Sequence, residues 1–167
     1  KFLNTLSAVD EVGAKARVEM LGTRSIKTSS KNWAIDLAIR MVDLTTLEGA
    51  DTPGKVRALC AKGVYPDPTD LTVPSVGAIC VYNDMVKIAR QALDAGGGKN
   101  IPVAAVSTAF PSGRASIEVK IQDTRDAIAN GATEIDMVID RGAFLAGKLG
   151  YVFDQIRTIK EVCGSNI

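Results

Sequence analysis

The chain has 167 residues, of which 46% are hydrophobic and 23% are charged, and its formal net charge is +1. This balance is ordinary for a globular protein and provides no basic surface of the kind that binds nucleic acid. Because the sequence contains no histidine, catalytic triads, zinc sites and haem ligation that depend on imidazole are excluded.

Cysteine use and hydropathy indicate where the protein works. The three cysteines, Cys60, Cys80 and Cys163, are odd in number and show no CxxC spacing, which favours a reducing compartment over a disulfide framework. No apolar run approaches the roughly 20 residues that span a bilayer. We therefore expect a cytoplasmic protein with neither a membrane nor a nucleic acid as partner.

Residues 1–40 are predicted to form an N-terminal helical extension. Apolar residues recur at helical spacing from Val9 to Met20. A second helix follows a polar stretch, with Ser30 near its start as a cap. The pattern changes after this helix, so we treat residues 41–167 as a separate region.

In residues 41–167, short β-prone runs alternate four times with amphipathic helices. The predicted strands cover 41–47, 76–82, 101–108 and 133–140. Strands that are separated by helices pair in parallel through crossover connections. Two α/β architectures fit this order, a doubly wound sheet and part of a (β/α)8 barrel.

Capping signals locate the intervening helices. Thr52 is suited to cap a helix whose first residue is Pro53, and Asp84 is expected to cap the next one. Gly131 is expected to end the third helix. A single final helix is predicted around Val152.

Polar residues on one face of the predicted strands distinguish the two architectures. Because alternate strand residues face opposite sides, Asp43 shares a face with Thr45, and Asp136 shares one with Asp140. Cys80 takes the same place in the second strand. In a doubly wound sheet both faces lie under helices, where unpaired carboxylates cost several kcal/mol. A barrel interior accommodates them near its active-site end, so the pattern favours a barrel.

The lysines are all predicted to lie on helices, in loops or in the N-terminal region. None lies in a predicted strand, where burial would lower its pKa, and we expect all of them to be solvated. The sequence also contains no GxGxxG or Walker pattern, which argues against a dinucleotide or P-loop enzyme.

Four segments carry a resemblance to a known family. VDLTTL at 42–47, AICVY at 78–82, FPSG at 110–113 and GATEIDMVI at 131–139 resemble deoxyribose-phosphate aldolase, in that order and spacing. The resemblance runs from about residue 31 to the end of the chain. It implies a class I aldolase on a (β/α)8 barrel, which uses no metal and no cofactor.

The resemblance also implies a reaction and a set of site residues. The enzyme would reversibly split the phosphorylated sugar 2-deoxy-D-ribose 5-phosphate through a lysine Schiff base, in deoxynucleotide catabolism, and would act as a homo-oligomer. Asp136 matches the catalytic aspartate that moves a proton through water. Residues matched to the substrate-binding cavity are Asp43, Thr45, Cys80, Thr108 and Phe110.

The chain departs from the family's pattern in two respects. The Schiff-base lysine, the lysine that tunes it and the phosphate site belong to the family's second half, whereas this sequence stops at Ile167, after four βα units of a half barrel. We therefore expect these residues to be a catalytically inert fragment. Asn83 stands where the family often has proline.

Two alternatives stay open at this point. One is a non-catalytic half-barrel module that pairs into a full barrel, because closing a sheet removes its exposed edges. The other is a different barrel lyase that acts on a sugar phosphate.

Overall fold

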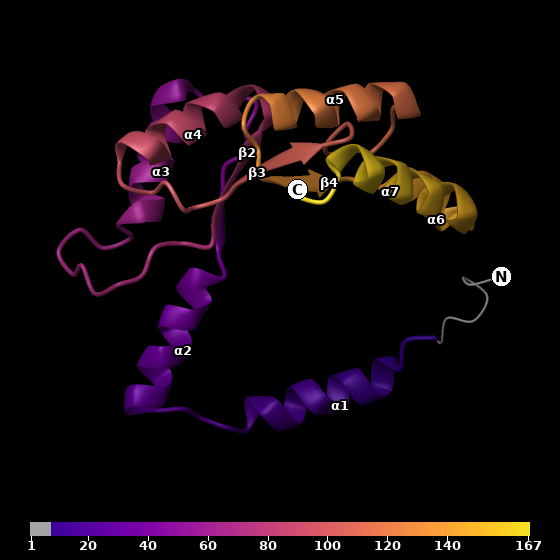
Figure 1. Ribbon diagram of the computed structural model, residues 1–167. Helices are drawn as coiled ribbons and strands as arrows, with labels where there is room; N and C mark the ends of the chain where they lie inside the picture. Colours follow the sequence, from indigo (N-terminus) through magenta and orange to yellow (C-terminus); the bar gives the residue numbers. More distant parts are fainter. Residues whose placement is uncertain (1–7) are drawn as a thin grey trace. The chain divides into compact units, whose positions relative to one another are not determined.

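The computed structural model describes residues 8–167 (Figure 1). Contacts divide the chain into two units, one that ends at Leu37 and one that comprises Ala38–Ile167. The part of the predicted extension that covers residues 1–7 lies outside the described residues.

Two helices precede the first strand, α1 (Glu11–Gly22) and α2 (Thr28–Arg40). The Asp10 side chain accepts a hydrogen bond from the backbone N–H of Gly13 and so caps α1. The expected cap at Ser30 is wrong, because α2 already begins at Thr28 and Ser30 lies within its first turn.

The second unit contains one parallel sheet. Its strands are β1 (Asp43–Thr45), β2 (Ala78–Tyr82), β3 (Val103–Ser107) and β4 (Glu134–Met137), in the order β1-β2-β3-β4. The elements between and after the strands are α3 (Pro53–Val64), η2 (Asn83–Met85), α4 (Val86–Ala95), α5 (Ile117–Ala129), α6 (Arg141–Leu145) and α7 (Leu149–Cys163). Four consecutive parallel strands with helical crossovers form half of a (β/α)8 barrel.

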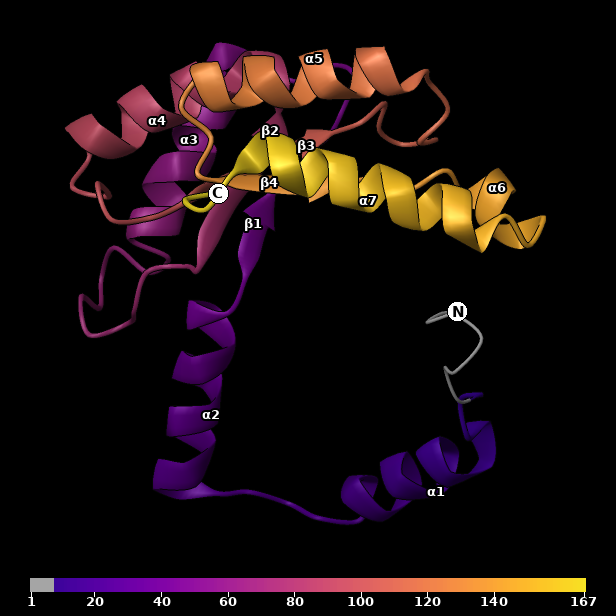
Figure 2. The ribbon, with the colours of Figure 1, turned by 45° about the vertical axis from the view of Figure 1, so that its right-hand side comes forward.

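The main core lies between one face of the sheet and its helices, with α3, α4 and α5 lying over the strands and α7 alongside β4 (Figures 1 and 2). Ile79, Val81 and Val103 point into this core and are fully buried. Helix residues such as Val56 and Leu93 complete it. Because strand side chains alternate, this packing fixes which residues of each strand face the other side.

Between the strands, the structure confirms the predicted start of α3 and the predicted end of α5, and it overturns the predicted start of α4. The Thr52 hydroxyl accepts a hydrogen bond from the backbone N–H of Lys55, and Pro53 follows in the first turn of α3. α5 ends before Gly131, which has a φ of +102°. Asp84 does not cap α4, because it lies inside the 3-10 turn η2 and α4 begins at Val86 without a side-chain cap.

The predicted strands were too long, and the segment after β4 is helical earlier than expected. β4 ends at Met137, and Asp140 caps the short helix α6 by accepting a hydrogen bond of 2.9 Å from the backbone N–H of Ala143. The single predicted final helix is therefore two helices, α6 and α7. Among residues 8–167, no helix is both long enough and apolar enough to cross a membrane.

Candidate functional site

The sheet face opposite the helix-covered core carries a set of polar side chains that we call the polar face: Asp43, Thr45, Cys80, Glu134 and Asp136. The register of the parallel strands places Thr45 beside Cys80 and Cys80 beside Ala104. Ala104 in turn pairs with Glu134, so one row of side chains crosses all four strands. The alternation expected for Asp43, Thr45, Cys80 and Asp136 is confirmed by this register.

A second row lies nearer the carboxyl ends of the strands. Tyr82 pairs with Val106, and Val106 pairs with Asp136. Asp136 is exposed on the polar face, whereas Val106 is buried. In a barrel this end of the strands is where reacting groups gather.

The pKa of the Cys80 thiol reflects the negative charges on the polar face. It is only 3% exposed, and burial together with the negative charge of Asp136 raises its pKa to about 11. The charges of Asp43 and Glu134 also raise the pKa of Cys80, whereas a hydrogen bond with Thr45 lowers it. Three carboxylates, one from β1 and two from β4, therefore lie close enough to influence one thiol, and Cys80 is a neutral thiol near pH 7.

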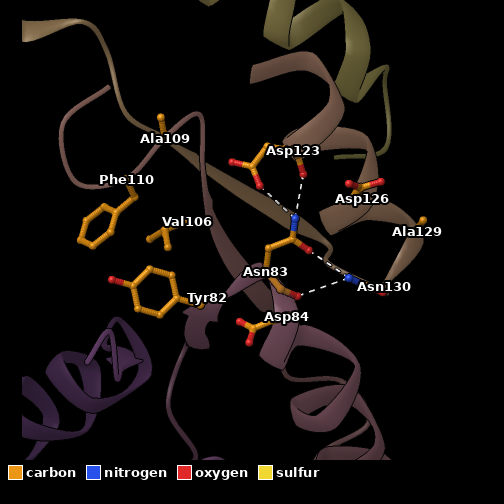
Figure 3. Close-up of a pocket in the computed structure, with 10 residues that line it drawn as sticks. All are labelled: Tyr82, Asn83, Asp84, Val106, Ala109, Phe110, Asp123, Asp126, Ala129 and Asn130. Carbon is orange, nitrogen blue, oxygen red and sulfur yellow. Dashed lines mark hydrogen bonds between the residues drawn. The ribbon is translucent and has the colours of Figure 1, made fainter. Parts of the chain in front are cut away.

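A cavity of about 550 Å³ opens at the carboxyl ends of β2 and β3 (Figure 3). One side is apolar, where the rings of Tyr82 and Phe110 meet edge to face with centroids 5.8 Å apart. These rings and Leu47 cover Cys80, Ala104 and Val106. The other side is polar and comes from η2 and α5. Its residues are Asn83, Asp84, Asp123, Asp126 and Asn130.

Thr108 lies at the end of β3 but not on the cavity wall. Its side chain is fully buried, and its hydroxyl donates to the carbonyl of Val138 (2.7 Å) and accepts from the N–H of Val138 (2.8 Å). The hydroxyl is therefore engaged with the main chain that follows β4. Phe110, two residues later, does line the cavity.

Two polar-face and cavity residues, Glu134 and Tyr82, were not singled out from the sequence. The signal was available, because Glu134 is two residues before Asp136 and Tyr82 is two residues after Cys80, which places each pair on one side of a strand. Their positions became clear only from the register, which shows that both rows continue across the sheet.

The expectation that every lysine is solvated is wrong for Lys120. This α5 side chain is fully buried, and its ammonium group donates a 2.9 Å hydrogen bond to the Gln155 amide oxygen on α7. Burial lowers the pKa of Lys120, against an opposing effect from Asp140. Lys120 lies between α5 and α7 on the helical side of the sheet. Within residues 8–167, no group of three or more Cys, Asp or Glu side chains is arranged to bind a metal ion.

Comparison with known proteins identifies related sequences and folds. Residues 37–167 match the sequence family described as DeoC/LacD family aldolase. Human deoxyribose-phosphate aldolase is 37% identical over 159 residues, which are 89% of this chain and 49% of that protein. The bovine deoxyribose-phosphate aldolase is 38% identical over 135 residues, covering 76% of this chain and 42% of that protein. The chain thus spans about half the length of the curated relatives it matches.

A solved structure shares the fold. A crystal structure assigned as a deoxyribose-phosphate aldolase from Coccidioides immitis superposes with a TM-score of 0.65 at 26% identity, covering 77% of this chain and 46% of that one. The expected half of a (β/α)8 barrel is confirmed by this similarity and by the four-stranded parallel sheet.

Proposed function

Because the chain belongs to the DeoC/LacD aldolase family, we propose that it supplies half of a class I aldolase site for 2-deoxy-D-ribose 5-phosphate. The reaction would be reversible cleavage to glyceraldehyde 3-phosphate and acetaldehyde. The observation that supports this most is the convergence of Asp43, Cys80 and Asp136 on one uncovered sheet face beside the cavity.

Asp136 is the proposed proton-transfer residue. In the imine of a class I aldolase, the bond between carbons 2 and 3 breaks while the hydroxyl on carbon 3 loses its proton and the imine nitrogen takes up the electron pair. Asp136 is exposed on the polar face, where water reaches its carboxylate. We assign it the transfer of that proton through water, and its return to carbon 2 of the enamine.

The other residues bind or shape the substrate in this proposal. Asp43 and Thr45 lie at the start and end of β1, and the Thr45 hydroxyl is oriented by donating to the Asp43 carbonyl (2.7 Å). Cys80 lies on the polar face as a neutral thiol and does not attack the carbonyl. Phe110 provides an apolar wall. We assign Thr108 an indirect part, because its hydroxyl is bonded to the main chain.

The imine-forming lysine is proposed to come from outside these residues. Strands β1–β4 contain no lysine. Lys120 is buried on the helical side of the sheet, so it does not face the polar face. The chain alone is therefore expected to be inert. A phosphorylated sugar, a homo-oligomeric assembly, a cytoplasmic location and a role in deoxynucleotide catabolism belong to the same proposal.

The experiment combines two polypeptides. The 167-residue chain is assayed for cleavage of 2-deoxy-D-ribose 5-phosphate, with borohydride trapping, alone and with the part of the human relative that it does not match. We expect neither turnover nor a lysine adduct for the chain alone, and both in the mixture. Asp136→Asn should reduce turnover of the mixture at least ~100-fold, whereas the exposed Asp154→Asn on α7 should not. A lysine adduct in the chain alone, or full turnover with Asp136→Asn, would contradict the proposal.

One observation favours a second function, a non-catalytic module that pairs into a full barrel. Within the part of the chain that the structure describes, β1 and β4 each pair with one strand only. Such edges are templates for association. Pairing β4 of one copy with β1 of another, twice, would produce eight strands and close the sheet.

A further inference from the structure

We propose that Asp123 on α5 is a positioning residue, which sets Phe110 and Asp136 relative to the rest of the site. The proposal rests on the proposed function, because it concerns the geometry of the same site. It is carried by hydrogen bonds that join the ends of β2 and β3 to one carboxylate, and by two further hydrogen bonds that join Thr108 to the segment after β4.

The Asp123 carboxylate accepts hydrogen bonds from the ends of β2 and β3. One oxygen accepts from the backbone N–H of Thr108 (2.8 Å) and from the Ser107 hydroxyl (3.3 Å). The other accepts from the side-chain amide of Asn83 (3.0 Å), which also donates to the Asp123 carbonyl (2.9 Å), as Figure 3 shows. The Asn83 oxygens in turn accept from the Asn130 amide, at 2.9 and 3.3 Å. The carboxylate is therefore shared between two loops.

The connection to the two rings is short. Asn83 directly follows Tyr82, and Thr108 precedes Phe110 by two residues. The centroids of the two rings are 5.8 Å apart. Each ring therefore lies within two residues of a group that donates a hydrogen bond to the Asp123 carboxylate. The connection to β4 runs through the Thr108 hydroxyl, whose two hydrogen bonds to Val138 hold the main chain two residues after Asp136.

The backbone between these anchors is in an unfavourable conformation. Thr108 and Ala109 both have a φ of 66°, in the left-handed region that is unfavourable for non-glycine residues. The bond from Thr108 N–H to Asp123 is the contact that holds the first of them. At the far end of the loop Gly113 also has a positive φ, and a side chain there would collide with the carbonyl of Ile139. Without Asp123, the segment that carries Phe110 is expected to relax.

Asn83 joins the loop after β2 to both Asp123 and the end of α5. Its side-chain amide N–H donates to the Asp123 carboxylate, and its side-chain oxygen accepts from the Asn130 amide. We infer that the loop after β2 is tied to α5 by side-chain hydrogen bonds in this protein, with Asn83 orienting the carboxylate.

The test uses the 167-residue chain and needs no turnover. NOEs between the rings of Tyr82 and Phe110 report the distance between these rings. Site-resolved alkylation of Cys80 by iodoacetamide between pH 8 and 10 reports how strongly the charge of Asp136 raises the pKa of the thiol. Asp123→Asn is expected to weaken the NOEs and to speed Cys80 alkylation by ~10-fold, since each unit of fall in thiol pKa raises the thiolate fraction tenfold. Asn83→Ala should change both readouts in the same direction, by less.

Two controls separate positioning from general loosening. Cys60 is 1% exposed in the core on the other side of the sheet, so its alkylation should stay slow in both variants. Asp126→Asn changes a carboxylate of the same helix and cavity that accepts a hydrogen bond from the Gln122 amide, and it should leave both readouts unchanged. Unchanged NOEs and alkylation in Asp123→Asn, or equal acceleration at Cys60, would overturn the proposal. If Asp123→Asn does not fold, the same criteria apply to Asn83→Ala. None of these readouts depends on aldolase activity, so the proposed function can fail separately.

Discussion

Lys120 and Gln155 form a buried polar pair that is joined by one hydrogen bond. The ammonium donates to the amide oxygen, while the Gln155 amide nitrogen has no partner among the described residues. A buried amide that lacks a partner costs about 1–3 kcal/mol, and a buried ammonium without a carboxylate in contact adds to that cost. The packing of α5 against α7 thus carries a local penalty.

We predict that replacing the pair with apolar residues of similar size stabilises the protein. Lys120→Met with Gln155→Leu should raise the free energy of unfolding at pH 7 by about 1–3 kcal/mol, measured by urea denaturation. Lys120→Met alone should gain less, because it leaves both polar groups of Gln155 without a partner. A double variant less stable than the wild type would show that the pair is net stabilising.

The pH dependence gives a second readout of the same residue. The folded-state pKa of Lys120 lies below its ordinary value of 10.5, so the unfolded chain binds the proton more readily. As the pH rises from the folded-state pKa of Lys120 toward its unfolded-state pKa, the free energy of unfolding of the wild type should increase. This gain should be lost again as the pH falls through the folded-state pKa. The difference in stability between wild type and the double variant should therefore shrink toward pH 10. Cysteine titration is common to both proteins and cancels in the difference.

At the scale of single elements, capping decides where the segment after β4 changes direction. Asp140 ends the extended chain and begins α6, and its carboxylate oxygen accepts from the N–H of Ala143. Gly113 of the preceding loop lies directly against Ile139, so this corner has little room to adjust. The cap therefore stabilises both the short helix and the corner.

We predict that Asp140→Ala lowers the free energy of unfolding by about 1 kcal/mol, as the loss of an N-cap does elsewhere. Asp140→Asn should retain most of the stability, because asparagine also accepts the capping hydrogen bond. Urea denaturation of the three proteins measures both effects. Equal losses for alanine and asparagine would indicate that the charge of Asp140, acting on Lys120, matters more than the cap.

At the scale of the whole molecule, the sheet of Ala38–Ile167 ends at β4 beside an apolar surface. A cavity of about 190 Å³ at this edge is lined mainly by side chains of β4 and α7, including Met137, Ile156 and Cys163. Ile156 is 45% exposed. Apolar surface next to an unpaired strand edge favours association with another polypeptide.

We predict that the chain self-associates in a concentration-dependent way through this edge. Ile156→Lys should shift the equilibrium toward monomer by ~10-fold or more in dissociation constant, since it places a charge in the apolar contact. Val119→Lys on α5, an apolar position that is 56% exposed and is not among the residues lining this cavity, is the matched control. Sedimentation velocity over a range of concentrations distinguishes them. Equal effects of both variants would place the contact elsewhere.

Much of the site could be predicted from alternation alone. Asp43, Thr45, Cys80 and Asp136 each directly follow an aliphatic residue in the sequence, and a strand with a period of two places each of them on the face opposite that neighbour. The fold class followed for a related reason, since carboxylates in parallel strands require a face without helices. Thr108, Asp140 and Lys120 could not be placed in this way, because each depends on a partner 15 to 35 residues away or on the exact end of a strand.

The sequence by itself determined the repeated βα order, the polar face and the family, because periodicity and motifs are local properties. Only the tertiary structure decided which lysine is buried, that Asp123 ties the ends of β2 and β3 together, and that Thr108 bonds to the main chain after β4. The physical reason is that burial and hydrogen-bond partners are set by the packing of α5 against the sheet and α7. That packing joins residues which no short segment of sequence contains.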